Sequence, residues 1–260
     1  MAPRKVILIQ RAGTYVGPAL ARRMAQAGFD LALHAAKPRQ VDELAAFGGD
    51  VEAIETPLSG PQSDATAEGW QSIIERTLSR FGRLDSVALF PPAIGVGVAV
   101  GPFLQATVQQ MRDMSSYLET TQIALQAVIP ALKSAGGQIL VFTSDAGAKP
   151  APNWSLYGAA RAGQNFLVRA IALEHAADHI SINVLGSKNA VFPGFPGAPA
   201  EGITDAQVAP GPWSAALERE TPLGRLGRMN ELAAFAQVLL DGSNRFQTAQ
   251  YFSYSGGWDV

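Results

Sequence analysis

Short runs of β-branched and aliphatic residues alternate with longer amphipathic stretches along this chain, and this alternation limits its folds more than any other feature. The runs have the length of buried strands, whereas the stretches between them place apolar residues at helical spacing. Strands that alternate with helices predict a parallel sheet covered on both faces. We therefore predict an α/β fold with a doubly wound, seven-stranded sheet, formed as a single Rossmann-like domain over residues 1–260.

Seven segments have the composition of strands: 5–10, 31–34, 51–55, 86–90, 137–143, 180–185 and 251–254. Helical spacing occurs in 17–27, 40–47, 65–81, 155–177 and 231–240, and in 108–134, which fits one long helix or two abutting ones. The segment 191–213 fits neither pattern, because it holds five prolines and four glycines. Since it follows the sixth strand, we expect a lid at the carboxyl edge of the sheet, where such folds bind ligands.

Composition excludes several classes of function: the chain has no cysteine, which rules out disulfides, thiolate nucleophiles and cysteine metal sites. A net charge of -2 argues against a nucleic-acid binder, which needs a basic face. The apolar, uncharged stretch 87–104 contains prolines and glycines that a membrane helix would not hold. His175 and His179 stand four residues apart, which is a spacing that metal ligands can have. Their place near an expected helix C-terminus, however, favours an interaction with the helix dipole over metal binding. We therefore predict a cytoplasmic protein that binds no nucleic acid, membrane or metal.

The turn after the first expected strand would carry the glycines of a dinucleotide fold, which let the backbone touch a pyrophosphate. It reads Gln10-Arg-Ala-Gly-Thr-Tyr-Val-Gly17. Two glycines remain in this turn. Arg11 and Tyr15, however, carry side chains at positions where a pyrophosphate could approach the backbone only if the residue were glycine. The second strand ends without an acidic residue for a ribose hydroxyl, although two basic residues leave room for a 2′-phosphate, Lys37 and Arg39. The turn is weak support for a dinucleotide, and a turn without any ligand is the plainer alternative.

Three residues near the fifth expected strand have the spacing of a proton-transfer site: Ser144, Tyr157 and Arg161. Ser144 follows the strand, while Tyr157 and Arg161 lie four residues apart on one face of the next helix. Tyrosine has an ordinary pKa of about 10 and is a poor base at neutral pH. A nearby guanidinium favours phenolate and cannot itself lose a proton. The alternative is a buried tyrosine beside a surface arginine, which the serine at this spacing disfavours.

At these residues the chain resembles the short-chain dehydrogenase/reductase fold along its whole length. Those enzymes carry a Ser-Tyr-Lys set, and Arg161 stands at the lysine position. Tyr-x-x-x-Arg together with an aromatic residue in the first turn is similar to the signature of halohydrin dehalogenases. Their turn has the form Thr-x4-(Phe/Tyr)-x-Gly, which Tyr15 and Gly17 match and Gln10 does not. The Asn-Asn-Ala-Gly segment usual after the fourth strand is replaced by Leu89-Phe-Pro-Pro92.

The resemblance implies a halide pocket in place of a nicotinamide, and therefore no cofactor. In that family the loop after the sixth strand binds halide through backbone N–H groups, which here would be those of Asn189 and Ala190. Tyr15 would form part of the pocket wall, and Ser187 stands where some relatives have proline. Lys188, between Ser187 and Asn189, could add attraction for anions or face water, and of the two we expect it to face water.

The same resemblance implies the reaction. Tyr157 would take the hydroxyl proton of a vicinal haloalcohol, Arg161 would favour the phenolate, and Ser144 would hydrogen-bond the substrate oxygen. The alkoxide would displace the neighbouring halide to leave an epoxide, and the reverse reaction would open an epoxide with halide, azide, cyanide or nitrite. The family also implies a homotetramer. Aromatic residues are candidates for the substrate pocket or for lid packing: Phe90, Trp154, Phe192, Phe195 and Trp213.

Two alternatives to this function remain open. One is an NAD(P)-dependent oxidoreductase with a degenerate glycine turn, which nucleotide binding would reveal. The other is a non-catalytic scaffold of the same fold, which a halide-release assay separates from an enzyme.

Overall fold

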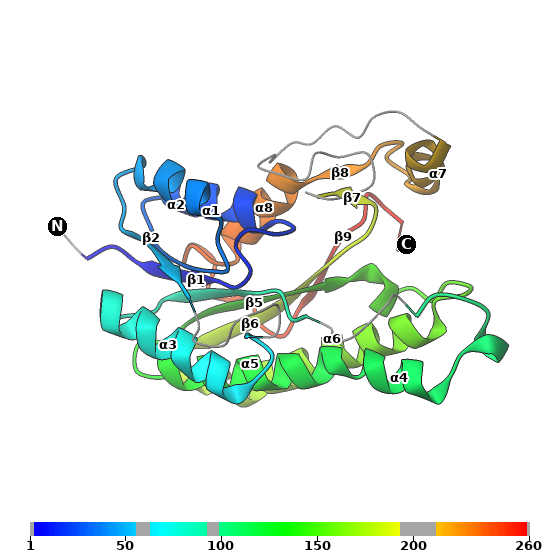
Figure 1. The fold of residues 1–260 in the computed structure, drawn as a ribbon, viewed down its shortest axis with the longest axis horizontal. Coiled ribbons are helices and arrows are strands. Elements are labelled where there is room, and N and C mark those ends of the chain that lie inside the picture. The colour runs from blue at the N-terminus through cyan, green and yellow to red at the C-terminus, as the bar shows by residue number, and fades with distance from the viewer. Residues whose placement is uncertain (1–2, 56–62, 93–98, 193–211, 259–260) are drawn as a thin grey trace.

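The computed structural model describes residues 3–55, 63–92, 99–192 and 212–258, and a parallel sheet of seven strands lies at its centre (Figure 1). The strand order is β3-β2-β1-β4-β5-β6-β9. The strands are β1 (Val6–Ile9), β2 (Asp30–His34), β3 (Val51–Ile54), β4 (Ser86–Leu89), β5 (Gly137–Ser144), β6 (Ile180–Ser187) and β9 (Tyr251–Tyr254). The order reverses between β1 and β4, which opens a crevice at the carboxyl ends of these strands. The predicted doubly wound α/β fold is confirmed.

Helices cover both faces of the sheet (Figure 1). One face carries α1 (Gly17–Gln26), α2 (Pro38–Ala45) and α8 (Met229–Val238). The other carries α3 (Ala67–Phe81), α4 (Val108–Met114), α5 (Ser116–Leu132) and α6 (Ser155–Glu174). Of the two possibilities for 108–134, two abutting helices are therefore correct. Single 3-10 turns follow β4, β5 and α6, namely η1 (Phe103–Gln105), η2 (Asp145–Gly147) and η3 (Ala176–Asp178).

The strand β1 shows why the sequence folds this way. Every residue of its Val-Ile-Leu-Ile run is buried, because the strand has helices on both sides. Ile7 and Ile9 belong to the core beneath α1 and α8. Val6 and Leu8 belong to the core beneath α3, α5 and α6. Alternate side chains thus serve two separate cores, as the period of a strand requires.

The predicted lid at 191–213 needs correction at both ends. Its first residue belongs to β7 (Ala190–Val191), which pairs in parallel with β8 (Gly227–Arg228) in a small second sheet. Its last residues begin α7 (Pro212–Glu220), where proline suits the first helical position because it has no N–H to satisfy. The rest of the predicted lid, 193–211, lies outside the described residues.

No helix in the described ranges combines the length and the apolar character needed to cross a bilayer. The single domain over 1–260 stays a prediction.

Candidate active site

A cavity of about 600 Å³ opens where the carboxyl ends of β1, β4, β5 and β6 meet the start of α6. It brings together every predicted site residue that the structure describes. Those lining it are Ser144, Tyr157, Arg161, Tyr15, Ser187, Asn189, Ala190, Phe90, Trp154 and Phe192. Phe195 and the Trp213 side chain lie outside the described residues. Further lining residues were not predicted, among them Phe142, Thr143 and Lys188.

Ser144 is held by the turn that follows it. Its Oγ accepts the Ala146 N–H at 3.2 Å, so its own proton can be donated into the cavity. The next residue, Asp145, is fully buried and accepts hydrogen bonds from the Tyr251 hydroxyl and, at 2.9 Å, from Ser253 Oγ. These contacts from β9 fix η2, and with it the direction of Ser144.

Two glycines let η2 pack directly on α6. A methyl group on Gly158 would lie 2.8 Å from the Ala146 carbonyl oxygen, and one on Gly147 would lie 2.6 Å from the Arg161 carbonyl carbon. This close backbone approach sets the spacing between Ser144 on one element and Tyr157 on the other.

We expect Gly147→Ala to lower the free energy of unfolding by about 1–3 kcal/mol, the usual range for overpacking. The added methyl group would meet α6 backbone, which cannot move aside as a flexible side chain can. Urea denaturation measures the loss. Gly101→Ala is the matched control, because its methyl group would have no described neighbour within 4 Å. Equal stability of Gly147→Ala and wild type would contradict the packing described for η2.

Arg161 is placed by aromatic and amide contacts. Its guanidinium carbon lies 3.5 Å from the centre of the Tyr117 ring and 5.2 Å from that of Tyr157. Nη1 donates to Gln164 Oε1 at 2.8 Å. The predicted meeting of arginine and tyrosine therefore occurs, but the arginine stacks chiefly on a second tyrosine that the sequence did not reveal.

Gln164 is the centre of a buried amide network behind the cavity. Its Oε1 also accepts from Thr143 Oγ1 at 3.0 Å, and its Nε2 donates to Thr121 Oγ1 at 2.9 Å. The fully buried glutamine thus ties β5 and α5 to Arg161 and fixes the rotamer of that arginine. Its position three residues after Arg161, on the same helix face, is a signal that could have identified it.

Tyr15 extends across the cavity from the turn between β1 and α1. Its ring packs edge to face against Phe90, Phe142 and Phe192, with centroid distances of 6.1, 6.3 and 5.7 Å. Its hydroxyl lies 2.5 Å from Ser187 Oγ. The residue has a φ of 50°, a left-handed conformation that costs a bulky side chain energy and is retained here by these contacts.

Burial raises the pKa of Tyr15 well above its ordinary value, and the Ser187 hydrogen bond opposes that only in part. The nearby charge of Asp145 raises it further. Tyr15 therefore stays a neutral phenol, so it is not a candidate base. Of the two tyrosines predicted for the site, Tyr157 is left for proton transfer.

The loop after β6 carries the predicted anion site. Asn189 has a φ of 51°. Its side-chain amide donates to Thr221 Oγ1 at 3.1 Å, and because Thr221 directly follows α7, this contact anchors the loop after β6 to the end of that helix. Its carbonyl accepts the Gly227 N–H at 3.0 Å. Lys188, which we expected to face water, is partly buried. Its side chain lines the cavity because the Trp154 ring holds its ammonium at 4.5 Å from the ring centre.

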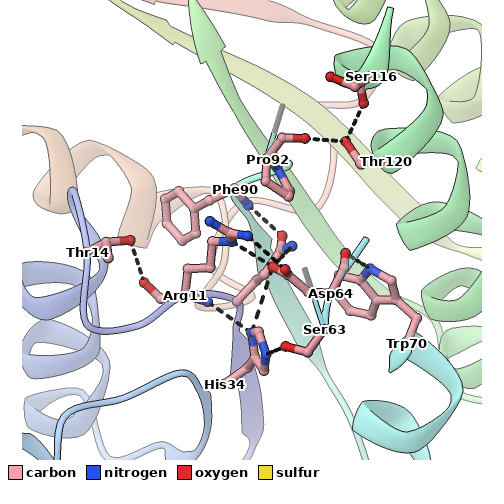
Figure 2. A network of polar contacts seen from close by, with 11 residues as sticks. Arg11, Thr14, His34, Ser63, Asp64, Trp70, Phe90, Pro92, Ser116 and Thr120 are labelled. Atoms are coloured by element: carbon pink, nitrogen blue, oxygen red, sulfur yellow. Dashed lines mark hydrogen bonds and ion pairs between the residues drawn. The ribbon is translucent and has the colours of Figure 1, made fainter. Parts of the chain in front are cut away.

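Side chains of the turn after β1 contact one another in a network of polar interactions around Asp64 (Figure 2). Arg11 donates to both carboxylate oxygens of Asp64, at 2.8 and 2.9 Å. Gln10, fully buried, donates to Asp64 at 2.6 Å and accepts the Phe90 N–H at 2.8 Å. Burial alone would raise the pKa of Asp64, but the hydrogen bonds and charge of Arg11 outweigh it and hold that pKa below its usual range.

Both glycines of the first turn serve internal packing. A methyl group on Gly13 would lie 2.9 Å from the Ala35 carbonyl oxygen, and one on Gly17 would lie 2.7 Å from that of Ala12. With Arg11 bound to Asp64 and Tyr15 filling the space beside Phe142, the residues present do not fit a nicotinamide dinucleotide.

Metal-ligating side chains do not gather in the described part of the chain: no group of three histidines, aspartates or glutamates is found there. His175 Nδ1 instead lies 2.8 Å from Asp178 Oδ2.

Comparisons with known proteins find similarity to reductases and dehydrogenases, and to one structure described as a dehalogenation enzyme. The family model described as enoyl-(acyl carrier protein) reductase matches residues 13–259. Cyclohexanol dehydrogenase from Acinetobacter sp. (strain SE19) is 30% identical, over 98% of this chain and 94% of its own. The solved short-chain dehydrogenase/reductase from Serratia marcescens BCRC 10948 has a TM-score of 0.77 at 21% identity and covers 99% of both chains. A solved structure described as a dehalogenation enzyme has a TM-score of 0.75 at 23% identity and covers 98% of both chains.

Proposed function

The chain belongs to the short-chain dehydrogenase/reductase superfamily, through the enoyl-(acyl carrier protein) reductase family whose model it matches, and within it we propose a cofactor-independent halohydrin dehalogenase. One observation carries this proposal: Tyr15 lines the same cavity as Ser144, Tyr157 and Arg161, where the resembled family has a halide pocket in place of a nicotinamide. The likeness to a structure described as a dehalogenation enzyme agrees with it.

The proposed reaction is an intramolecular displacement. The Tyr157 phenolate accepts the hydroxyl proton of a vicinal haloalcohol, and Ser144 donates a hydrogen bond to the substrate oxygen. The alkoxide oxygen then attacks the adjacent carbon, whose bond to the halogen breaks, so that an epoxide and a halide ion form. Solvent takes the proton from Tyr157. Because both reacting groups belong to one molecule, orientation in the cavity supplies much of the acceleration.

The departing halide is proposed to leave toward the loop of Ser187, Asn189 and Ala190, with Tyr15 as its wall. Backbone N–H groups can hold an anion weakly enough for it to leave. A neutral Tyr15 suits this role, because a phenolate there would repel the halide. Assembly as a homotetramer stays a prediction.

The two directions of the reaction should respond oppositely to pH. Ring closure needs Tyr157 as phenolate, whereas epoxide opening needs it as phenol to protonate the departing oxygen. We expect dehalogenation to rise and ring opening to fall across one pH range. Arg161→Gln removes the positive charge 5.2 Å from the Tyr157 ring, so dehalogenation at neutral pH should weaken. Parallel pH–rate profiles for the two directions would contradict a shared acid and base.

The curated relatives favour a second candidate, an oxidoreductase, since several bear the names of dehydrogenases or oxidoreductases. In this fold such an enzyme would use NAD(P). Titration of NADH and NADPH by calorimetry separates the candidates. We expect no saturable binding up to about 1 mM, the weak end of useful affinity. Saturable binding of either nucleotide would favour the oxidoreductase.

A further inference from the structure

Lys188 lies inside the cavity, on the loop that follows β6. Its backbone N–H donates to the Tyr254 carbonyl at 3.2 Å, which fixes the loop against β9. Its ammonium lies 4.5 Å from the centre of the Trp154 ring and 4.9 Å from that of Trp258. Two aromatic faces therefore hold the charge at the cavity wall, adjacent in sequence to Ser187 and Asn189.

The charge of Lys188 is poorly compensated. No carboxylate among the described residues lies within ion-pair distance of the Lys188 ammonium. The ammonium is instead attracted more weakly by the faces of two tryptophan rings. Burial lowers the pKa of Lys188, while Glu220, Tyr157 and Asp145 oppose this from a greater distance. An ammonium that has lost water and gained no counter-ion gains most when a small anion comes near.

We propose that Lys188 is a specificity-determining residue, whose ammonium draws the small anion of the reaction into the cavity and holds it beside the 187–190 loop. This rests on the proposed function, because it names Lys188 as the group that selects the ionic nucleophile for ring opening. Bromide and azide gain from the charge, whereas a neutral nucleophile such as water gains nothing. The loop amides would orient the anion, and Lys188 would set its affinity.

The test measures anion binding without any epoxide. Bromide and azide are titrated into the whole protein at constant low ionic strength, and tryptophan fluorescence is followed because Trp154 contacts Lys188. Lys188→Met removes the charge and keeps the apolar stem, and we expect about tenfold weaker binding. Lys188→Arg keeps the charge and should bind within about threefold of wild type.

Lys149→Met is the matched control. Lys149 Nζ lies 5.2 Å from the same Trp258 ring and donates to the Trp258 carbonyl at 2.5 Å, but it does not line the cavity. Its loss should leave anion affinity unchanged. An equal loss of anion affinity in Lys149→Met and Lys188→Met would overturn the proposal, because the overall charge of the protein would then explain the weaker binding.

Unchanged affinity in Lys188→Met would also overturn it. If that variant does not fold, Lys188→Gln provides the same comparison with a polar side chain. In ring opening, the KM for azide should rise in the variant while the KM for the epoxide stays constant. Weaker anion binding in Lys188→Met, combined with no halide release by the wild type, would support the anion site but contradict the proposed dehalogenase activity.

Discussion

Replacing Tyr157 by phenylalanine should reduce dehalogenation and epoxide opening together, each by about a thousandfold, within the range that positioned acids and bases contribute. The change deletes one hydroxyl and keeps the ring that packs against Tyr117 and Trp154, at centroid distances of 5.9 and 5.5 Å. The fold should therefore be unaffected. Initial rates of halide release and of azide-dependent ring opening measure the loss in each direction.

Tyr15→Phe is the matched control for this substitution. It deletes the hydroxyl of the other cavity tyrosine, which contacts Ser187, and keeps the aromatic cluster. We expect it to retain most of the activity, since a phenol kept neutral by burial is not the base. Ser144→Ala should weaken both directions less than Tyr157→Phe. A Tyr157→Phe enzyme with near wild-type rates, or a Tyr15→Phe enzyme that is dead, would contradict these roles.

Arg11→Met should lower the free energy of unfolding by about 3 kcal/mol at neutral pH, the cost of leaving one member of a buried ion pair alone. The Asp64 side chain is only 1% exposed, and two side chains, Arg11 and Gln10, now donate hydrogen bonds to it. In the variant only the hydrogen bond from Gln10 would remain. Chemical denaturation of variant and wild type at several pH values measures the difference.

The difference should depend on pH. In the wild type Arg11 holds the pKa of Asp64 below its usual value. The contribution of the Arg11–Asp64 pair to the free energy of unfolding is therefore present above about pH 4 and is lost as pH falls through the lowered pKa. In the variant, burial without the guanidinium raises that pKa. The deficit of the variant should therefore shrink as pH falls from 7 toward 4.

A second substitution separates the lost charge pair from lost packing. Arg11→Met/Asp64→Asn carries no buried charge at this position, and its amide oxygen can still accept from Gln10. We expect it to recover at least about half of the lost stability at pH 7. No recovery, or a deficit independent of pH, would mean that the Arg11–Asp64 pair does not act as described.

The fold was predictable because its signals are local. The Val-Ile-Leu-Ile run of β1 and the helical spacing of α3 each reflect the faces that a single element buries. The helix α7 was missed because Pro212 and the glycine-rich segment before it favour a loop. The contact next to it comes from a distant part of the chain, since the Asn189 side-chain amide donates to Thr221 Oγ1 directly after the helix.

The site was predictable where its residues belong to one element or to adjacent ones. Ser144, Tyr157 and Arg161 have a spacing that the sequence shows directly. Tyr117 was not predictable as the stacking partner of Arg161, because that contact depends on how α5 packs against α6.

The same reason explains Gln10 and Lys188. Gln10 departs from the threonine of the resembled family, and its partner Asp64 lies 54 residues away along the chain. Lys188 is held at the cavity partly by Trp258, which follows β9 in the sequence and supplies a ring face for the ammonium. Neither partner can be read from the local pattern.

Halide release from a vicinal bromoalcohol, with purified protein and no added nucleotide, tests the central claim most directly. The account predicts stoichiometric bromide and epoxide, a rate unchanged by NADH or NADPH, and loss of both products in Tyr157→Phe. No bromide release by the wild type across a panel of small and bulky bromoalcohols, or release that requires a nucleotide, would contradict it.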